Sequence, residues 1–430
     1  MYIFNLFNIL IKYLLILIPL VFINLKHGVN LIIFITFIGS LWYYLINYKS
    51  KINNIKLSFE HKMTILVLAS PVLAIGISQH FRQNFYPNNW DAPIRMLLCI
   101  PIFVAISHGW LIKKNKESII EAWLKWTIPC SLLISLVIRI YFPATNWGNY
   151  KTTYFVDPLT FCSYTLLFTF LSIIGLLSFY KKNIFLYKYL IISAIITGFY
   201  LSSSSGARTG WLNFPFFIFF WWYFQLNTLR LRERFIAIFS LIATLIIILF
   251  INNGMIDKIR LGVDQLINYQ FNSINEDTSV AMRLSFYRMG ISYFFERPIS
   301  GWGDLSWMSE MNKAQFMSYA TEGTRIAPRH GFHNEIITSS VRSGIWGLFS
   351  ILLFFVFISL NAFKDMKLYM TDERLKLISL SLLVIIVHLF FAGLTTEILN
   401  LTFLSSFIGI TIALFIGEKL YIKNNLNSTN

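Results

Sequence analysis

Long apolar segments recur along almost the whole chain and are separated by short polar loops. Each segment has roughly 18–22 apolar residues, the length at which a helix crosses the hydrocarbon core of a bilayer. The apolar residues follow one another instead of alternating with polar ones, which excludes a transmembrane β-barrel. The pattern predicts an all-α polytopic membrane protein of about 12 transmembrane helices, near residues 4–25, 28–47, 63–80, 94–112, 118–141, 158–180, 184–202, 210–229, 235–253, 337–362, 375–393 and 400–418.

The amino-acid composition supports this class. Of the 430 residues, 56% are apolar and 13% are charged, whereas a soluble protein carries about 25% charged residues. These values exclude a soluble multidomain enzyme and a disordered chain. The net charge of +16 suggests a nucleic-acid binder, but topology explains an excess of Lys and Arg in a membrane protein. Cys99, Cys130 and Cys162 lie in apolar segments, so neither a disulfide framework nor a cysteine metal site is expected.

Basic residues gather in every second short loop. The loops after the even-numbered predicted spans hold 18 Lys and Arg residues, and the other short loops hold six. Short cytoplasmic loops carry the excess of Lys and Arg. The distribution therefore predicts that the even-numbered loops and both termini are cytoplasmic, and that the long loop after the ninth span lies outside.

The predicted spans divide the chain into four parts. Residues 1–253 hold spans one to nine, residues 254–336 form the long outer loop, residues 337–420 hold the last spans, and residues 421–430 form a cytoplasmic tail that is expected to be disordered from Asn424. A loop of about 80 residues is seldom structureless and is usually functional. We expect it to be a small subdomain with amphipathic helices.

A turn rich in small polar residues, Ser202–Trp211, joins the predicted seventh and eighth spans on the outer side. Its small side chains let the backbone bend and approach a ligand. Arg208 then lies at a membrane boundary, where the free N–H groups and dipole of a helix start help an arginine to bind an anion. The alternative is an arginine that extends to lipid phosphates.

The segment Thr278–Pro298 is predicted to form an amphipathic helix that lies on the outer leaflet or on the bundle. Its apolar face is expected to consist of Val280, Leu284, Tyr287, Ile291 and Phe294. Arg283 lies one turn from Tyr287, and Arg288 points elsewhere. Arginine suits phosphate because its planar fork donates bidentate hydrogen bonds. The alternative is an interfacial helix whose arginines only contact lipid.

A third polar segment leads into the predicted tenth span. Gly331 breaks the chain, and His333, Asn334 and Glu335 are expected in the first turn of the following helix. The N-terminus of a helix disfavours an imidazolium, so His333 is a candidate neutral base. The alternative is a capping or packing role.

Topology predicts that Arg208, Arg283 and His333 lie on the same side of the membrane. The sequence has no phosphate-binding loop and no cluster of residues at metal-ligand spacing. Two arginines would hold a pyrophosphate leaving group, and the histidine would accept a proton from an attacking hydroxyl, which accelerates a reaction about 10²- to 10⁴-fold.

These residues resemble those of the O-antigen ligases of Gram-negative bacteria. Ala281–Tyr287 with Pro298-Ile-Ser-Gly301-Trp-Gly303 is similar to the arginine-containing helix and Pro…Gly-x-Gly turn of that family. His333-Asn-Glu-Ile-Ile with Gly344-Ile-Trp-Gly347-Leu is similar to its His-Asn motif and glycine-spaced span. Arg208 after a small-residue turn also matches. The superfamily includes O-antigen polymerases and protein O-oligosaccharyltransferases.

The resemblance implies a GT-C-like bundle in the bacterial inner membrane that ligates an O-antigen from undecaprenyl pyrophosphate to a hydroxyl of lipid A-core. The transfer would invert the anomeric centre at the periplasmic face and need no metal and no cofactor. Arg208 and Arg283 would bind the donor pyrophosphate, and His333 would be the catalytic base. Additional candidates without a defined role are Arg288, Tyr287, Asn334, Glu335, Arg95 and Arg82, of which the last two flank an outer loop that could contact the donor or lipid A.

Two other functions remain open at this point. An O-antigen polymerase would use a second lipid-linked glycan as its acceptor. A flippase for lipid-linked polysaccharide belongs to a different class, and a transporter usually shows charged residues in the middle of the membrane. The sequence gathers its polar residues at the outer face instead.

Overall fold

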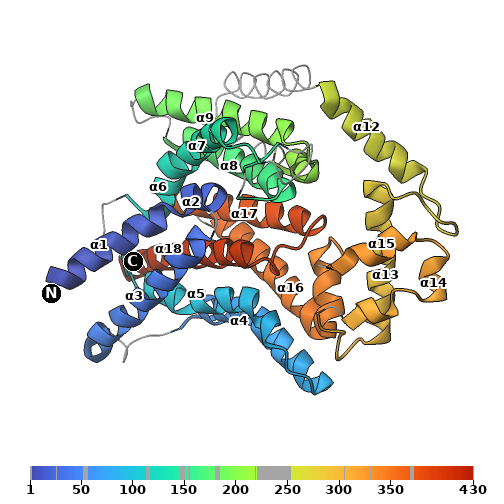
Figure 1. The fold of residues 1–430 in the computed structure, drawn as a ribbon. Helices are drawn as coiled ribbons and strands as arrows, with labels where there is room; N and C mark the ends of the chain where they lie inside the picture. Colours follow the sequence, from blue (N-terminus) through green and yellow to red (C-terminus); the bar gives the residue numbers. More distant parts are fainter. Residues whose placement is uncertain are drawn as a thin grey trace.

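The computed structural model describes residues 2–25, 27–51, 57–112, 117–144, 151–153, 155–179, 185–217, 219, 253–304, 306–329, 331–368 and 372–429. These residues form helices and no strand, with one isolated β-bridge between Pro143 and Thr153. The long helices pack in a bundle, and the shorter helices of residues 253–334 lie at one end of it (Figure 1). Both ends of the chain lie toward the opposite end. The predicted all-α class is confirmed.

The first part of the chain supplies most of the bundle helices. They are α1 (Tyr2–Ile16), α2 (Ile18–Asn24), α3 (Gly28–Lys51), α4 (Phe59–Arg82), the 3₁₀ turn η2 (Pro87–Trp90), α5 (Asp91–Ser107), α6 (Ile119–Ala122), the π-helical turn η3 (Trp123–Thr127), α7 (Ile128–Tyr141), α8 (Pro158–Phe179), α9 (Phe185–Ser204) and the 3₁₀ turn η4 (Thr209–Asn213).

The second part begins with the helices at the end of the bundle. They are α12 (Asn253–Ile267), α13 (Ser279–Glu296), η5 (Ser306–Glu310), α14 (Ala314–Met317), α15 (Glu322–Ile326) and η6 (Ala327–Arg329). The bundle is completed by α16 (Glu335–Leu368), α17 (Glu373–Gly393) and α18 (Thr402–Thr429).

Eight helices in the described part of the chain are long and apolar enough to cross a membrane, or nine with α1 and α2 counted as one bent span. The bend between α1 and α2 is 50° and comes just before Pro19, whose missing N–H and ring break the helical hydrogen bonding. The predicted span 235–253 and most of 210–229 lie outside the described residues. The protein is therefore a multi-pass membrane protein, and the predicted count of about 12 is not confirmed.

Burial separates the central helices from the lipid-facing ones. In α18, 94% of the most apolar stretch is buried inside the protein, whereas in α3 the figure is 39%. A helix that faces lipid can leave its apolar residues uncovered, because the bilayer itself is their solvent. Helices α8 and α17 join α18 at the centre, and α5 packs along α18.

The helices of residues 253–334 have a small apolar core of their own. Its buried residues are Phe286, Met289, Tyr293, Trp302, Trp307, Phe316, Tyr319, Ala320, Phe332 and Val341. Because Val341 belongs to α16, this core is continuous with the start of that bundle helix. The short helices are therefore fixed to the bundle through α13 and α16.

The sequence predicted the extent of α13 correctly, but a different face packs against the bundle. Thr278 caps the helix, as expected, by accepting a hydrogen bond from the Ala281 N–H. Ile291 is half exposed instead of packed. The buried face contains Gly290, where a Cβ atom would lie 2.2 Å from Ile337 of α16. The absence of a side chain at Gly290 lets the two helices approach closely, which overrides the hydrophobic pattern.

The expected disorder of the C-terminal tail is wrong, because α18 continues to Thr429. Lys423 lies beyond the apolar part of the helix and forms ion pairs with Glu60 and Asp365. Asp365 also pairs with the buried Lys419. These contacts tie the end of α18 to α4 and α16, so the helix stays ordered after its apolar sequence ends.

A break in α16 is held by the turn that follows α13. Gly344 has φ +62° and ψ −147°, a region that only glycine adopts readily. The carbonyl of Pro298 accepts a hydrogen bond from the Ile345 N–H, and the Trp302 N–H donates to the Val341 carbonyl. The Pro…Gly-x-Gly segment and the glycine-spaced span noted in the sequence are thus two sides of one backbone contact.

We predict that Gly344→Ala destabilises the protein. The new Cβ would lie 2.5 Å from the Pro298 carbonyl oxygen, and the backbone conformation alone costs about 1–3 kcal/mol for a residue with a side chain. The midpoint of thermal unfolding in detergent is expected to fall. Gly393→Ala is the matched control, because its Cβ would meet its nearest neighbour at 3.4 Å. Equal midpoints for the two variants would contradict the prediction.

Candidate functional site

The site begins with an unusual backbone conformation just before α16. His333 has φ +49°, in the left-handed region that few residues with a side chain adopt. The sequence predicted His333 inside the first turn of the helix, and this is wrong. Asn334 instead caps the helix by accepting a hydrogen bond from the Ile337 N–H. A left-handed residue costs about 1–2 kcal/mol, so His333 must be held in place by its neighbours.

Glu397, in the connection between α17 and α18, provides that restraint. Its Oε1 accepts a hydrogen bond of 2.7 Å from the His333 N–H and another from the Thr338 hydroxyl. Its Oε2 lies 4.0 Å from the His333 Nδ1. The carboxylate therefore fixes the histidine backbone and lies beside its ring. The imidazole, with 39% of its side chain exposed, stays accessible to a substrate.

Gly331 makes this arrangement possible. It has φ +135°, and a Cβ atom at this position would lie 2.3 Å from the Glu397 Oε1. The sequence identified Gly331 as a chain break, and its missing side chain also leaves room for the Glu397 carboxylate. Sequence reasoning missed Glu397 itself, because a single acidic residue between two apolar segments is weak evidence for a site.

Glu335 is completely buried and serves to hold the backbone. Its carboxylate accepts hydrogen bonds from the N–H groups of Ile398 and Leu399, and from the side chains of Ser339 and Asn400. With these donors around it, the carboxylate fixes the residues next to Glu397. Glu335 therefore acts in the site by positioning the connection between α17 and α18.

Helix α13 forms the other wall of the site. The Phe286 ring stacks on the His333 imidazole at 5.6 Å between centroids. The Tyr287 hydroxyl donates to the Leu394 carbonyl and is hydrogen-bonded to Asn334. Burial raises the pKa of the Tyr287 phenol, although the nearby Arg283 opposes this shift. Tyr287 therefore stays protonated at neutral pH and is a hydrogen-bond donor, and Arg283 lies close to it.

Arg208 takes part in a different contact. It precedes η4, and its guanidinium Nη1 lies 2.7 Å from where a Cβ atom of Gly262 would be, so it reaches α12. The turn before it is fixed to α8, since the Ser202 hydroxyl donates to the Cys162 carbonyl. The small side chains predicted to bring the backbone to a ligand instead bring it to α8, where Gly210 packs against Ser163.

The other arginine candidates lie outside the His333 cluster. Arg288 donates to the Phe271 carbonyl and stacks 3.7 Å above the Tyr319 ring, so it stabilises the helices of residues 253–334. Arg95 pairs with Asp91 one turn earlier in α5. Arg82 donates to the Ser300 and Arg342 carbonyls and lines a separate cavity, described below.

Searching the described residues for a metal site finds no group of three or more His, Cys, Asp or Glu side chains that could hold an ion. What the cluster does offer is an accessible imidazole, a carboxylate beside it, a protonated phenol and a guanidinium. This set can accept a proton and bind an anion.

Residues 192–352 match the family model described as O-Antigen ligase. Over these residues the chain is similar to the O-antigen ligase family. The matched segment runs from α9 into α16 and includes Arg208, Arg283, His333 and Gly344. The comparison with curated proteins gave no match.

The match to this family model supports a glycosyltransferase-like activity of the ligase or polymerase type. The substrates of that family are in general of the lipid-linked polysaccharide and lipid A-core type. The family and the apolar helices together make the chain a multi-pass bacterial membrane protein.

We predict that Glu335→Ala destabilises the fold. The change leaves the N–H groups of Ile398 and Leu399 without their acceptor, which costs about 1–3 kcal/mol for each buried group. Thermal unfolding in detergent measures the loss.

Ser339→Ala is the control for this prediction. It removes a single neutral donor to the same carboxylate and should cost about 1 kcal/mol. A Glu335→Ala variant as stable as Ser339→Ala would show that the carboxylate does not hold the connection.

Proposed function

We propose that the protein is an O-antigen ligase that transfers O-antigen from undecaprenyl pyrophosphate to a hydroxyl of lipid A-core at the periplasmic face. The observation that supports this most directly is the His333–Glu397 arrangement beside Arg283 and Tyr287, since these side chains can deprotonate a hydroxyl next to an anion. The match to the family model described as O-Antigen ligase also supports an activity of this general type.

In the proposed reaction His333 acts as the general base. A lipid A-core hydroxyl attacks the anomeric carbon of the donor sugar, and its proton passes to the imidazole. The new bond joins the acceptor oxygen to the anomeric carbon, and the bond between that carbon and the pyrophosphate oxygen breaks. Attack opposite the leaving group inverts the anomeric centre. Glu397 would stabilise the positive charge that the imidazole gains.

Arg283 and Arg208 are the proposed ligands of the departing pyrophosphate. Guanidinium groups can bind phosphate oxygens in a bidentate manner and stabilise the charge that develops on them. Arg283 belongs to α13, Arg208 reaches α12, and these two helices pack against each other. Both arginines thus border the same helix pair, which supports a shared ligand. Glu397 holds the His333 backbone, and Arg283 lies close to Tyr287, so the proposed base and one proposed ligand of the pyrophosphate belong to the same cluster.

The sequence and the fold together support one orientation in the membrane. Both ends of the chain lie toward one end of the bundle, and the helices of residues 253–334 lie at the other (Figure 1). The distribution of Lys and Arg predicts cytoplasmic termini. We therefore propose that the His333 site faces the periplasm, where both lipid-linked substrates can reach it from the bilayer.

We predict that His333→Ala abolishes ligation while the protein remains folded and inserted. The variant lacks the group that accepts the hydroxyl proton, and loss of such a base lowers a rate by about 10²- to 10⁴-fold. A gel of lipopolysaccharide from cells carrying the variant should show bare core, and undecaprenyl-linked polymer should accumulate.

Two further outcomes interpret this gel. Glu397→Gln keeps a group of the same size but removes its charge, so it should give an intermediate loss of ligated product. Core bearing one repeat unit in the His333→Ala strain would instead indicate a polymerase. Wild-type ligation by a normally inserted His333→Ala variant would remove the base assignment.

A second prediction concerns the arginines. Arg208→Lys should ligate far less than wild type, because a point charge cannot replace the planar fork that binds a diphosphate. Ligated lipopolysaccharide is compared at equal membrane levels of the two proteins. If the two are equally active, charge alone is sufficient at this position.

A further inference from the structure

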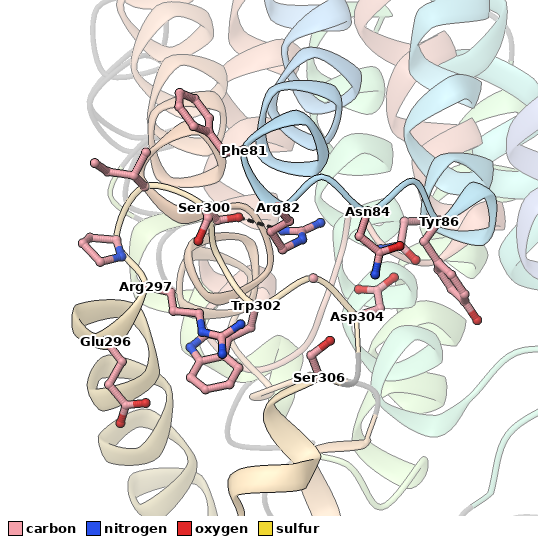
Figure 2. A pocket seen from close by; sticks show the side chains of 14 residues that line it. Phe81, Arg82, Asn84, Tyr86, Glu296, Arg297, Ser300, Trp302, Asp304 and Ser306 are labelled. Atoms are coloured by element: carbon pink, nitrogen blue, oxygen red, sulfur yellow. Dashed lines mark hydrogen bonds between the residues drawn. The ribbon is translucent and has the colours of Figure 1, made fainter.

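A cavity of about 900 Å³ lies between the end of α4, the turn η2 and the segment that follows α13. Figure 2 shows Arg82 near its centre and Arg297 beside Trp302. The cavity is separate from the His333 cluster, since Arg283 and Arg297 stand at opposite ends of α13, about 20 Å apart along the helix axis. Its volume is within the range of about 300–1,000 Å³ for ligand sites.

The two carboxylates that line this cavity among the described residues are already paired. Asp304 lies 2.5 Å from the Arg342 Nε, and Glu296 lies 2.5 Å from the Lys313 Nζ. Their negative charges are therefore compensated by cations outside the lining residues. With both carboxylates paired in this way, the two lining arginines add an excess of positive charge at the cavity, although Asp304 also attracts Arg82.

Arg82 is held at one edge of its guanidinium. Its Nη1 donates to the Ser78 hydroxyl and to the Ser300 and Arg342 carbonyls, all of which are neutral. Its Nη2 lies 3.2 Å from where a Cβ atom of Gly303 would be. Because Gly303 has no side chain, the remaining edge of the fork faces the cavity.

Arg297 is placed by an aromatic ring. Its Cζ lies 3.8 Å from the centroid of Trp302, whose indole N–H donates to the Tyr293 carbonyl. Asp304 attracts Arg82, but no described carboxylate lies within ion-pair distance of Arg82 or Arg297, and the charges of the two arginines repel each other. Two like charges that face one cavity are stabilised by an anion between them.

The rest of the wall suits a sugar. The aromatic residues Phe81 and Tyr86 and the amide of Asn84 line the cavity (Figure 2), and so does the amide of Asn89. Apolar and aromatic side chains with a few placed polar groups are typical of ligand sites. The amides can exchange hydrogen bonds with hydroxyl groups.

We propose that this cavity binds an acidic sugar residue of a glycan substrate, with its phosphate or carboxylate group between Arg82 and Arg297. The proposal rests on the proposed function, because it takes the ligand from the glycans that the reaction joins. The acidic sugar belongs either to the lipid A-core acceptor or to the polymer of the donor, and the two share the same recognition chemistry.

The test measures binding of soluble probes to the full-length protein in detergent micelles by titration calorimetry. One pair of probes is a phosphorylated core oligosaccharide and the same compound after dephosphorylation. The second pair is a repeat-unit oligosaccharide with a uronic acid and its carboxyl-reduced form. We expect at least one acidic probe to bind about tenfold more tightly than its neutral partner. The pair that shows the preference identifies the acceptor or the donor as the source.

Arg297→Gln tests the assignment of the cavity. Arg297 is exposed and lies outside both apolar cores, so the variant should fold. It should bind the acidic probe about tenfold more weakly and the neutral probe equally well. Arg260→Gln is the matched control, an exposed arginine of α12 that does not line the cavity. Equal binding by the two variants, or no preference for either acidic probe, would overturn the proposal.

The result is independent of the transfer reaction. His333→Ala should bind the acidic probe as tightly as wild type, because binding in the cavity needs no base. Suppose that Arg297→Gln loses probe binding while His333→Ala ligates normally. This result would refute the assignment of His333 as the base and would support the assignment of the cavity as an acidic-sugar site. If Arg297→Gln binds the acidic probe as tightly as wild type, the proposed acidic-sugar site is refuted, and the conclusion about His333 is unaffected.

Discussion

Two carboxylates connect the start of α16 to the connection between α17 and α18, and the candidate site depends on them. Glu335 of α16 accepts the N–H groups of Ile398 and Leu399, and Glu397 of the connection accepts the N–H of His333. Each segment thus supplies an acid to the backbone of the other. A buried carboxylate is tolerated only with such donors, so the two segments cannot separate without leaving charged groups unsolvated. This reciprocity compensates for the left-handed backbone at His333.

Helix α13 contacts the start of α16 near its own first turns and, through the turn that follows it, again near Gly344. Near its first turns it presents Arg283, Phe286 and Tyr287 to the site before α16. At its far end the following turn binds the backbone of α16 around the break at Gly344. The turn that contacts α16 also lines the cavity of Arg82 and Arg297, so α13 connects that cavity to the His333 cluster. Because α13 and the turn after it meet α16 at closely packed glycines, Gly290 and Gly344, the spacing between the two sites is fixed by backbone contact.

The sequence predicted those features that depend on local chemistry. Runs of apolar residues identified the bundle helices, and Thr278 marked the start of α13. Glu397 could not be predicted, because its role depends on a hydrogen bond from His333, which lies 64 positions earlier in the chain. The packed face of α13 was missed for a related reason, since the close approach of α16 at Gly290 outweighs hydrophobic spacing. The roles of Arg82 and Arg288 likewise depend on backbone carbonyls and rings brought close only by folding.

The distribution of buried charge favours transfer over transport. The ion pairs of Lys419 and Lys423 with Asp365 lie in the last turns of α18, and the Glu335–Glu397 pair of acids precedes its start. Between them, in the central α17, the buried His388 is bound to Ser163 and Asn213. A carrier of a charged lipid would need compensating charges along its path through the membrane. In the part of the chain that the structure describes, these buried charges lie toward the two ends of the bundle, a distribution that fits transfer at one end better than carriage through the middle.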